Sequence, residues 1–249
     1  MTIEAAMVTG RSAELAPLIS IVGTDGSGKS TVSAKMLGLV SSYGAAQTAH
    51  LGLRSGDLGR AIKRLPLIGA ILDRQISRKS GQARNKNERI PDPLTAAVIY
   101  IFSTLRIRRF KRMMTLRRKG VLIVTDRYPQ IDVPGFYDGP GLSAARAEGW
   151  FVRWLAARER RHYEWMASHV PDLVIRLNVD VETAFARKPD HNYNSLKQKV
   201  EATPKLRFGG APMVDIDSCL PLETVLQQAE QAITQTMAKL GREPSAASS

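Results

Sequence analysis

Short apolar runs of strand length alternate with longer stretches of helical spacing along most of the chain. Residues 18–22, 121–125 and 173–179 are the clearest strand candidates, and residues 47–53 and 213–216 are weaker ones. Helical spacing covers residues 30–40, 94–119, 144–168 and 222–240. Strands that are apolar on both faces and separated by helices are typical of a parallel sheet covered on both sides. The pattern therefore predicts an α/β fold.

The two ends of the chain lack this alternation. Residues 1–16 are predicted to form a flexible leader and residues 243–249 a disordered tail, which leaves one domain over residues 17–242. The N-terminus has no basic segment of the signal-peptide kind, and the longest apolar stretch has 12 residues, where a membrane span needs about 20. The single cysteine, Cys219, fits a reducing compartment and is expected to be buried. These features favour a cytoplasmic protein.

The charge is concentrated in one part of the chain. Lys and Arg number 36 against 23 Asp and Glu, a net charge of +13, and residues 54–119 alone hold 18 basic and four acidic side chains. We call residues 54–119 the basic block. A field of this sign favours an anionic partner, which leaves a phosphorylated substrate, nucleic acid and an anionic membrane as alternatives.

The segment from Gly23 to Ser30 matches the phosphate-binding pattern G-x-x-x-x-G-K-[ST] at every fixed position. Its glycines let successive backbone N–H groups turn toward a phosphate, Lys29 reaches the outer phosphates, and the Ser30 hydroxyl can bind Mg²⁺. A strand precedes the loop and a helix follows it, as a P-loop requires. The expected ATP-binding residues here are Asp25, Gly26, Ser27, Gly28, Lys29, Ser30 and Thr31.

A second candidate lies where the strand at 121–125 ends. Asp126 follows this strand directly, at the edge of an open α/β sheet where ligands bind, and can hold Mg²⁺ together with Ser30. The next residue, Arg127, has the guanidinium fork that grips a phosphate. The predicted catalytic residues are therefore Lys29, Asp126 and Arg127.

Four segments together resemble the thymidylate kinase family of P-loop nucleotide kinases. They are GTDGSGKST at 23–31, VLIVTDRY at 121–128, FYDGPGL at 136–142 and PDLVIRLNVDVETAFARK at 171–188. The resemblance implies a P-loop NTPase-type three-layer α/β/α fold, a five-stranded parallel sheet, ATP as donor and a mobile lid over about residues 187–207. It also implies that Asp25, Arg127 and Tyr137 face the acceptor and that Arg187, where the lid begins, contacts ATP.

The chain departs from that family around the acceptor. After the second strand it has His50 to Gly56, HLGLRSG, where the family has an Arg-Glu-Pro-Gly type stretch, so Arg54 is the candidate substitute. Arg106 falls close to the family's acceptor-binding Asp-Arg pair on the long middle helix. In the lid, Lys197, Lys199 and Lys205 stand where many members have arginines. These differences keep ATP use and alter the acceptor site.

The leading hypothesis is a kinase that moves the γ-phosphoryl of MgATP to an anionic acceptor, first of all a nucleoside monophosphate. A kinase of a sugar-phosphate or lipid-linked glycan stays open, as does a non-catalytic nucleotide-binding module. The basic block leaves a peripheral membrane contact open, with the apolar run 65–72 at the interface. Its few aromatic residues argue against nucleic acid. Trp150 and Trp154, one helical turn apart, are assigned to core or interface packing, and a homodimer stays open.

Overall fold

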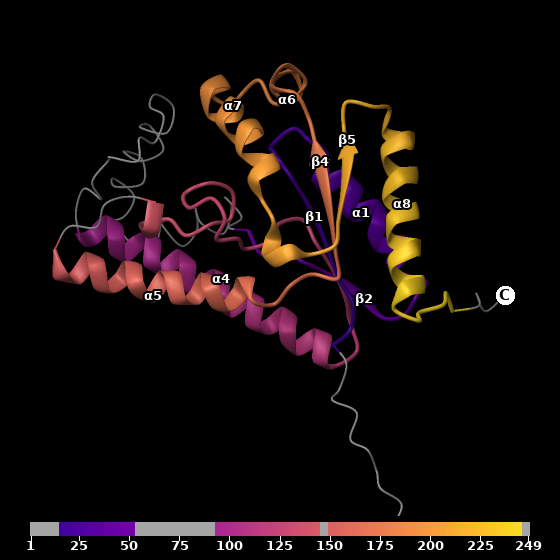
Figure 1. Cartoon of the computed structure of the whole chain (residues 1–249), viewed down its shortest axis with the longest axis horizontal. Coiled ribbons are helices and arrows are strands. Elements are labelled where there is room, and N and C mark those ends of the chain that lie inside the picture. Colours follow the sequence, from indigo (N-terminus) through magenta and orange to yellow (C-terminus); the bar gives the residue numbers. More distant parts are fainter. Residues whose placement is uncertain (1–14, 53–92, 145–148, 246–249) are drawn as a thin grey trace, which may run out of the picture.

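A five-stranded parallel sheet forms the centre of the molecule (Figure 1). The structure is a computed structural model that describes residues 15–52, 93–144 and 149–245. The strands are β1 (Leu18–Gly23), β2 (Ala46–Ala49), β3 (Leu122–Thr125), β4 (Leu173–Asn178) and β5 (Met213–Asp217). Their order is β2-β3-β1-β4-β5, so β1 lies in the middle and pairs with β3 and β4. The predicted α/β fold with a parallel sheet is confirmed.

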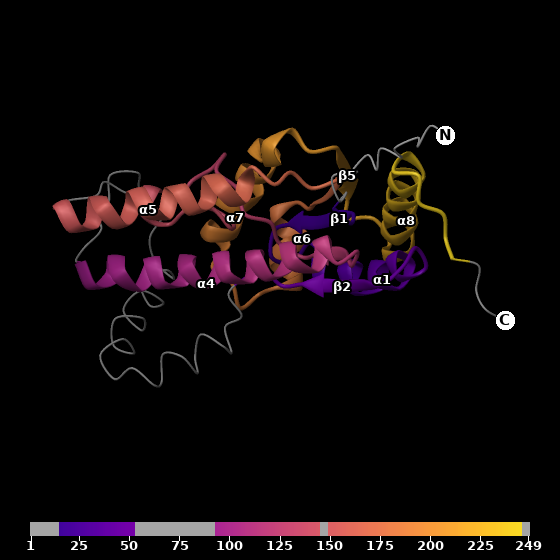
Figure 2. The same cartoon turned by 90° about the horizontal axis from the view of Figure 1, so that it is seen from below.

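Helices cover both faces of the sheet. They are α1 (Lys29–Ser41), α4 (Pro93–Arg118), α5 (Trp150–Ala167), α6 (Val181–Arg187), α7 (Tyr193–Ala202) and α8 (Leu222–Lys239). Helices α1 and α8 lie on one side, and α4 and α5 lie side by side on the other (Figure 2). Three layers result, as the resemblance implied.

The alternation of side chains along β1 explains why this strand is apolar throughout. Ile19 and Ile21 point into the core under α1 and α8, together with Met36. Leu18 and Val22 point the other way, into the core under α4 and α5, which includes Phe110. A central strand that is buried on both faces loses the polar positions of a half-exposed one.

Two predicted elements differ in extent from the observed ones. The strand predicted over 47–53 is β2, which ends at Ala49 and is a half-buried edge strand. The helix predicted over 144–168 begins at Trp150, because Gly149 adopts a φ of 79° at its N-cap. Trp150 and Trp154 are 75% and 45% exposed, so the core half of their assignment to core or interface packing is wrong and the interface half stays a prediction. Cys219 is exposed as well, and not buried as expected.

Several predictions fall on residues that the structure does not describe. Arg54, the apolar run 65–72 and most of the basic block lie outside the described residues, as do residues 1–14 and 246–249. Ala16, assigned to the leader, is buried, and its carbonyl oxygen accepts a hydrogen bond of 2.7 Å from Arg117 Nε. Among the described residues, no helix is long and apolar enough to span a membrane.

Candidate active site

The P-loop connects β1 to α1 at the carboxyl edge of the sheet. The Lys29 ammonium at the start of α1 folds over the loop, 2.9 Å from the Thr24 carbonyl oxygen and 3.6 Å from Asp25 Oδ1. Ser30 and Thr31 are exposed in the first turn of α1. Burial lowers the pKa of the Lys29 ammonium below its usual range. The loop therefore places a cation and the positive end of a helix at one point, which suits a phosphate group.

Two glycines are needed for the shape of this loop. Gly28 adopts a φ of 80° at the N-cap of α1, a left-handed conformation that side chains rarely take. Gly26 has a φ of 86°, and a Cβ there would lie 2.6 Å from the carbonyl oxygen of Ala184 in α6. The loop can thus form and pack against α6 only without side chains at these positions.

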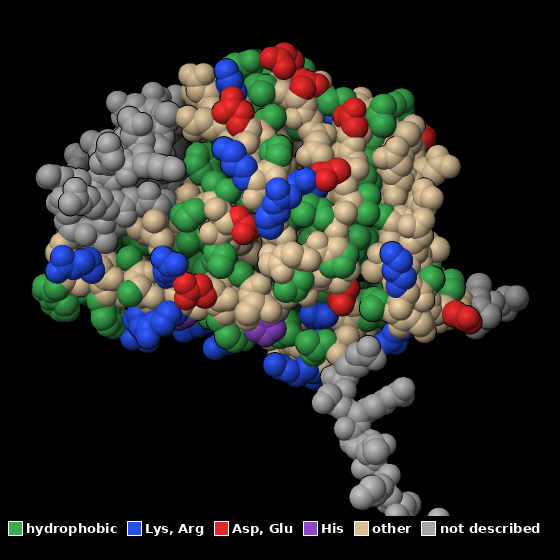
Figure 3. Space-filling model, in the orientation of Figure 1, with side chains coloured by type: hydrophobic (Ala, Val, Ile, Leu, Met, Phe, Trp, Pro, Cys, Tyr) green, Lys and Arg blue, Asp and Glu red, His purple; other side chains and the backbone are tan. Residues whose placement is uncertain are grey.

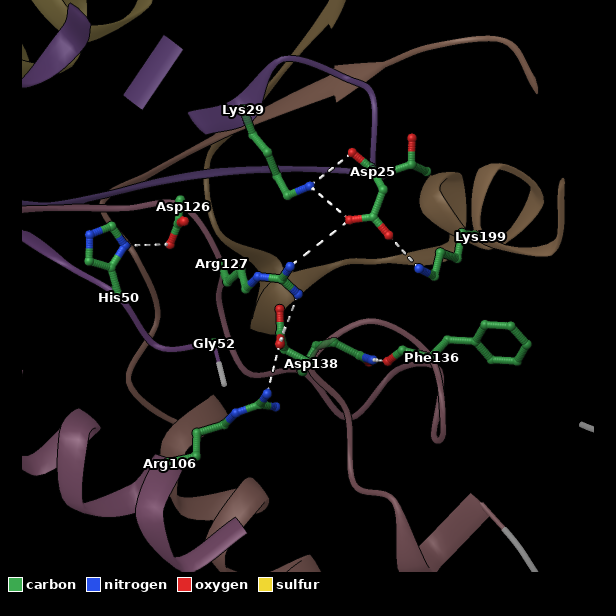
Figure 4. A network of polar contacts seen from close by, with 12 residues as sticks. Asp25, Lys29, His50, Gly52, Arg106, Asp126, Arg127, Phe136, Asp138 and Lys199 are labelled. Carbon is green, nitrogen blue, oxygen red and sulfur yellow. Dashed lines mark hydrogen bonds and ion pairs between the residues drawn. The ribbon is translucent and has the colours of Figure 1, made fainter. Parts of the chain in front are cut away.

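Asp25 is surrounded by positive groups (Figure 4). Its carboxylate accepts a hydrogen bond from Lys199 Nζ of α7, and Arg127 Nη2 lies 4.0 Å from Oδ1. His191 Nδ1 lies 3.8 Å from Oδ2. Burial opposes ionisation of Asp25, but the charges of Lys199, Lys29 and Arg127 outweigh it and hold the pKa of the carboxyl well below its usual range. Asp25 is therefore anionic throughout the physiological range.

Asp126 follows β3, the strand beside β1, and its carboxylate points toward His50 (Figure 4). Its Oδ1 is buried without a hydrogen-bond partner among the described residues, and His50 Nδ1 lies 3.4 Å away. A carboxylate oxygen of this kind and the exposed Ser30 hydroxyl are oxygen donors of the type that Mg²⁺ prefers. Among the described residues no cluster of three His, Cys, Asp or Glu could hold a metal, so phosphate oxygens and water would complete such a site.

Arg127 lies between two carboxylates. Its Nη1 is 3.7 Å from Asp138 Oδ1, on the side opposite to Asp25, and its side chain passes directly over Gly52. Arg106 of α4 binds the same Asp138 oxygen at 2.8 Å and the Tyr163 hydroxyl at 2.9 Å. Arg106 is thus buried beneath Asp138, and its Nε has no hydrogen-bond partner within the described part of the chain.

The loop after β3 brings Asp138 and Tyr137 to this place. Gln130 holds the turn, because its Nε2 donates to the carbonyl oxygens of Val133 and Phe136 at 2.9 and 2.8 Å. Tyr137 has a φ of 49° and donates its hydroxyl proton to the carbonyl oxygen of Lys199. The phenol predicted to face the acceptor therefore holds the end of α7 beside Asp25.

Helices α6 and α7 cover the loop from the side of β4. Arg187 at the end of α6 donates to the carbonyl oxygens of Gly26 at 3.2 Å and Ser218 at 3.0 Å. Lys199 reaches Asp25 from α7. The predicted lid over 187–207 thus includes a turn and α7, and it contacts the P-loop through charged side chains.

The structure joins three of the predicted site residues in one network and places two others beside it. Lys29, Asp25 and Arg127 form one network, Asp126 lies on the neighbouring strand end, and Arg187 contacts the backbone of the loop. Asp138 was missed, although it stands inside the FYDGPGL segment. Lys199 was noted only as a lid lysine, since no local pattern reveals its partner Asp25, 174 residues away.

The architecture and the loop define a class of protein. The structure of a deoxyadenosine kinase from M. mycoides with bound dATP superposes with a TM-score of 0.52, over 88% of this chain and 99% of that one, at 14% sequence identity. Together with the P-loop, this likeness shows a P-loop nucleotide kinase-like fold. It does not distinguish the thymidylate kinase type from its neighbours.

The sequence relatives give the family. The uncharacterized ATP-binding protein YghR of Escherichia coli K12 is 41% identical over 218 residues, which cover 87% of this chain and 86% of YghR. The uncharacterized ATP-binding protein YghS of the same strain is 41% identical over 217 residues, with 87% and 92% covered. The chain belongs to the family of YghR and YghS. No protein-family model matches it.

Proposed function

We propose that this protein is an ATP-dependent kinase that transfers the γ-phosphoryl group of MgATP to a nucleoside monophosphate. The names of YghR and YghS support ATP as the donor, and the fold of the deoxyadenosine kinase supports a nucleoside-type acceptor. The observation that carries the proposal is that Lys29 at the start of α1 and Arg127 after β3, from two separate segments, come together at Asp25 of the P-loop, with Asp126 at the end of the neighbouring strand.

Each of these residues has a task in phosphoryl transfer, which depends mainly on positioning and charge neutralisation. The loop N–H groups and Lys29 hold the outer phosphates, and Arg127 neutralises charge on the transferred group. Ser30 and Asp126 would hold Mg²⁺, which supplies further positive charge when bound. Asp25 keeps Lys29, Arg127 and Lys199 together, because its carboxylate contacts or faces all three.

The surroundings of Arg127, where the acceptor would bind, contain side chains of both charges. Arg127 is 40% exposed, which favours a phosphate on the acceptor, and the buried Arg106 holds Asp138 beneath it. A second candidate is the uncharged hydroxyl of a deoxynucleoside, since Asp25 and Asp138 flank Arg127 and would repel a phosphate. We also propose that the enzyme is of the thymidylate kinase-like type and that Arg54 and Tyr137 contact the acceptor.

The test is a panel of acceptors incubated with the purified full chain and MgATP, in which ADP and the phosphorylated acceptor are both measured. Nucleoside monophosphates, deoxynucleosides, sugar phosphates and lipid-linked glycans form the four arms, and Lys29→Ala is the negative control. Phosphorylation of a nucleoside monophosphate supports the proposal. Phosphorylation in another arm only would reassign the acceptor, and nucleotide binding without phosphorylation of any compound would identify a non-catalytic module.

A further inference from the structure

The outer surface of helices α4 and α5 combines exposed cations with tryptophan side chains. Its members are Arg108, Lys111 and Arg112 of α4 with Trp154, Arg158, Arg161 and Trp165 of α5, and all seven are exposed. We call these residues the basic aromatic face. Along α5, Trp154, Arg158, Arg161 and Trp165 recur at intervals of three and four residues, so they form one stripe of the helix.

Contacts across the two helices show that this is one continuous surface. Lys111 Nζ of α4 lies 5.7 Å from the ring centroid of Trp165 of α5, and the Arg158 guanidinium lies 4.9 Å from that of Trp154. Burial and the charges of Arg158, Lys111 and Arg161 lower the pKa of His162, which places these three cations around one side chain. Cations from both helices therefore converge on the same side of the molecule.

Little on the two helices compensates this charge. Over residues 93–118 and 150–167 the acidic side chains are Glu159, which is buried, and Glu164, which pairs with Arg160 at 2.7 Å. Within the part of the chain that the structure describes, Arg108, Lys111, Arg112, Arg158 and Arg161 form no ion pair. Five uncompensated cations on one surface favour an anionic partner.

Apolar side chains continue the face toward the ends of the helices farthest from the sheet. Trp150 is 75% exposed, and on α4 Leu94 and Ile101 are 47% and 49% exposed. Ile101 stands two turns before Arg108, and Trp150 one turn before Trp154. Figure 3 shows hydrophobic side chains at this end of the α4–α5 pair and Lys and Arg side chains along its lower edge.

We propose that the basic aromatic face, with Trp150, Leu94 and Ile101 at its end, binds the surface of an anionic lipid bilayer. Arginine and lysine reach phosphate headgroups, tryptophan sits at the level of the headgroups, and aliphatic side chains enter the acyl boundary. This surface lies on the outer helical layer, and the proposal does not depend on the reaction at the P-loop.

Two other occupants agree less well with the observations. Single-stranded nucleic acid would use the cations and the tryptophan rings, but it offers no apolar environment for Leu94 and Ile101. In a twofold dimer the face would pack against its own copy, so the uncompensated cations of one protomer would be brought close to those of the other. A bilayer accommodates the cations, the rings and the aliphatic side chains together.

The test is co-sedimentation of the full chain with vesicles of phosphatidylcholine, alone or mixed with phosphatidylglycerol. We expect pelleting with the mixed vesicles only, accompanied by a blue shift of tryptophan fluorescence. Each basic residue at an anionic surface contributes about fivefold to partitioning, so Arg158→Glu/Arg161→Glu should lower it by at least about 25-fold. Trp150→Ala should weaken the binding that persists at high salt.

The matched control is Lys239→Glu/Arg242→Glu, which reverses two exposed charges at the end of α8, in the opposite layer. This variant should keep most of the binding, and thermal melting of all variants checks that each is folded. Failure of the chain to pellet with anionic vesicles would overturn the proposal, as would equal losses in the two charge-reversal variants. Two further results would overturn it. One is that Arg158→Glu/Arg161→Glu weakens binding of an oligonucleotide but not of vesicles. The other is that Trp150→Ala disrupts a dimer but leaves vesicle binding unchanged.

Discussion

Lys29 stands at the first position of α1, where its ammonium folds over the P-loop at 2.9 Å from the Thr24 carbonyl oxygen. Lys29→Ala removes the cation that would contact the transferring phosphoryl group, so kcat/KM should fall at least about 100-fold. The melting temperature should change little, because the side chain lines the loop and not the core. Lys35→Ala, on the exposed side of α1, is the control and should keep full activity.

Asp126 is the residue expected to make the reaction respond to magnesium. Because Oδ1 is buried without a hydrogen-bond partner among the described residues, Asp126→Asn keeps the shape and removes the charge. Half-maximal activation should move to higher Mg²⁺ concentration, while metal-free ATP binding stays close to that of the parent. A magnesium titration measures this, and identical activation curves would contradict the role of Asp126.

Gly52 leaves the space through which Arg127 passes. A Cβ at Gly52 would lie 2.5 Å from Arg127 Cδ and 2.8 Å from Nε, so Gly52→Ala must push the guanidinium away from its place between Asp25 and Asp138. We expect kcat/KM to fall about tenfold with little change in melting temperature, because a flexible side chain moves rather than the backbone. Gly38→Ala in α1, where a Cβ meets nothing within 4 Å, is the matched control.

At the scale of elements, α6 and α7 are joined to the P-loop by a few polar contacts. Asp25 to Lys199 is the contact between α7 and the loop, and Tyr137 holds the carbonyl of the same lysine. The N-terminus of helix α7 is capped by Asn192, whose side chain accepts a hydrogen bond of 3.0 Å from the Ser195 N–H. A helix attached in this way can move as a unit when the charges at the loop change.

Lys199→Met tests this attachment through its dependence on pH. In the folded protein the pKa of Asp25 lies below the 3.8 of an unperturbed carboxyl, so the ion pair stabilises the fold above about pH 4, and this contribution is lost as the pH falls further. The variant should melt about 2–4 °C lower at neutral pH, for a loss of about 1 kcal/mol. Melting curves across pH should show the difference shrinking below pH 4, and a constant difference would contradict the pairing.

At the scale of the whole molecule, Arg117 joins three segments at the amino edge of the sheet. From the end of α4 it donates to the Ala16 carbonyl oxygen before β1 and to Asp172 Oδ2 before β4, at 2.7 and 3.0 Å. Asp172 in turn accepts a hydrogen bond from the Leu18 N–H at 2.7 Å. The helical layer and the two central strands are thus connected by one buried cation.

Arg117→Met should therefore lower the stability of the entire domain. Arg117 is buried while its partner Asp172 is 29% exposed, so loss of these charged hydrogen bonds costs about 2 kcal/mol, which corresponds to a decrease of about 4–8 °C in melting temperature for a domain of this size. Arg118→Met, at the exposed neighbouring position, is the control and should melt close to the parent. Thermal unfolding followed by circular dichroism measures both, and equal melting temperatures would show that Arg117 does not connect these segments.

Local patterns in the sequence predicted the strands of the sheet and the site residues in two contiguous motifs, the P-loop and the end of β3. The P-loop is contiguous, and β1, β3 and β4 were predicted within one residue at each end, because strands buried on both faces leave an uninterrupted apolar signal. Asp126 and Arg127 were found because they follow such a strand directly. The edge strand β2 was predicted too long, since it has no buried face to define its end.

Only the tertiary structure decided which distant side chains meet. Asp25 and Lys199 are 174 residues apart, and Arg106 reaches Asp138 across 32 residues, so no periodicity connects either pair. The basic aromatic face joins cations of the basic block to tryptophans of α5, although the sequence of the block showed few aromatic residues. Packing of α4 against α5 puts these side chains on one surface, because the register between two helices follows from their cores and not from their exposed residues.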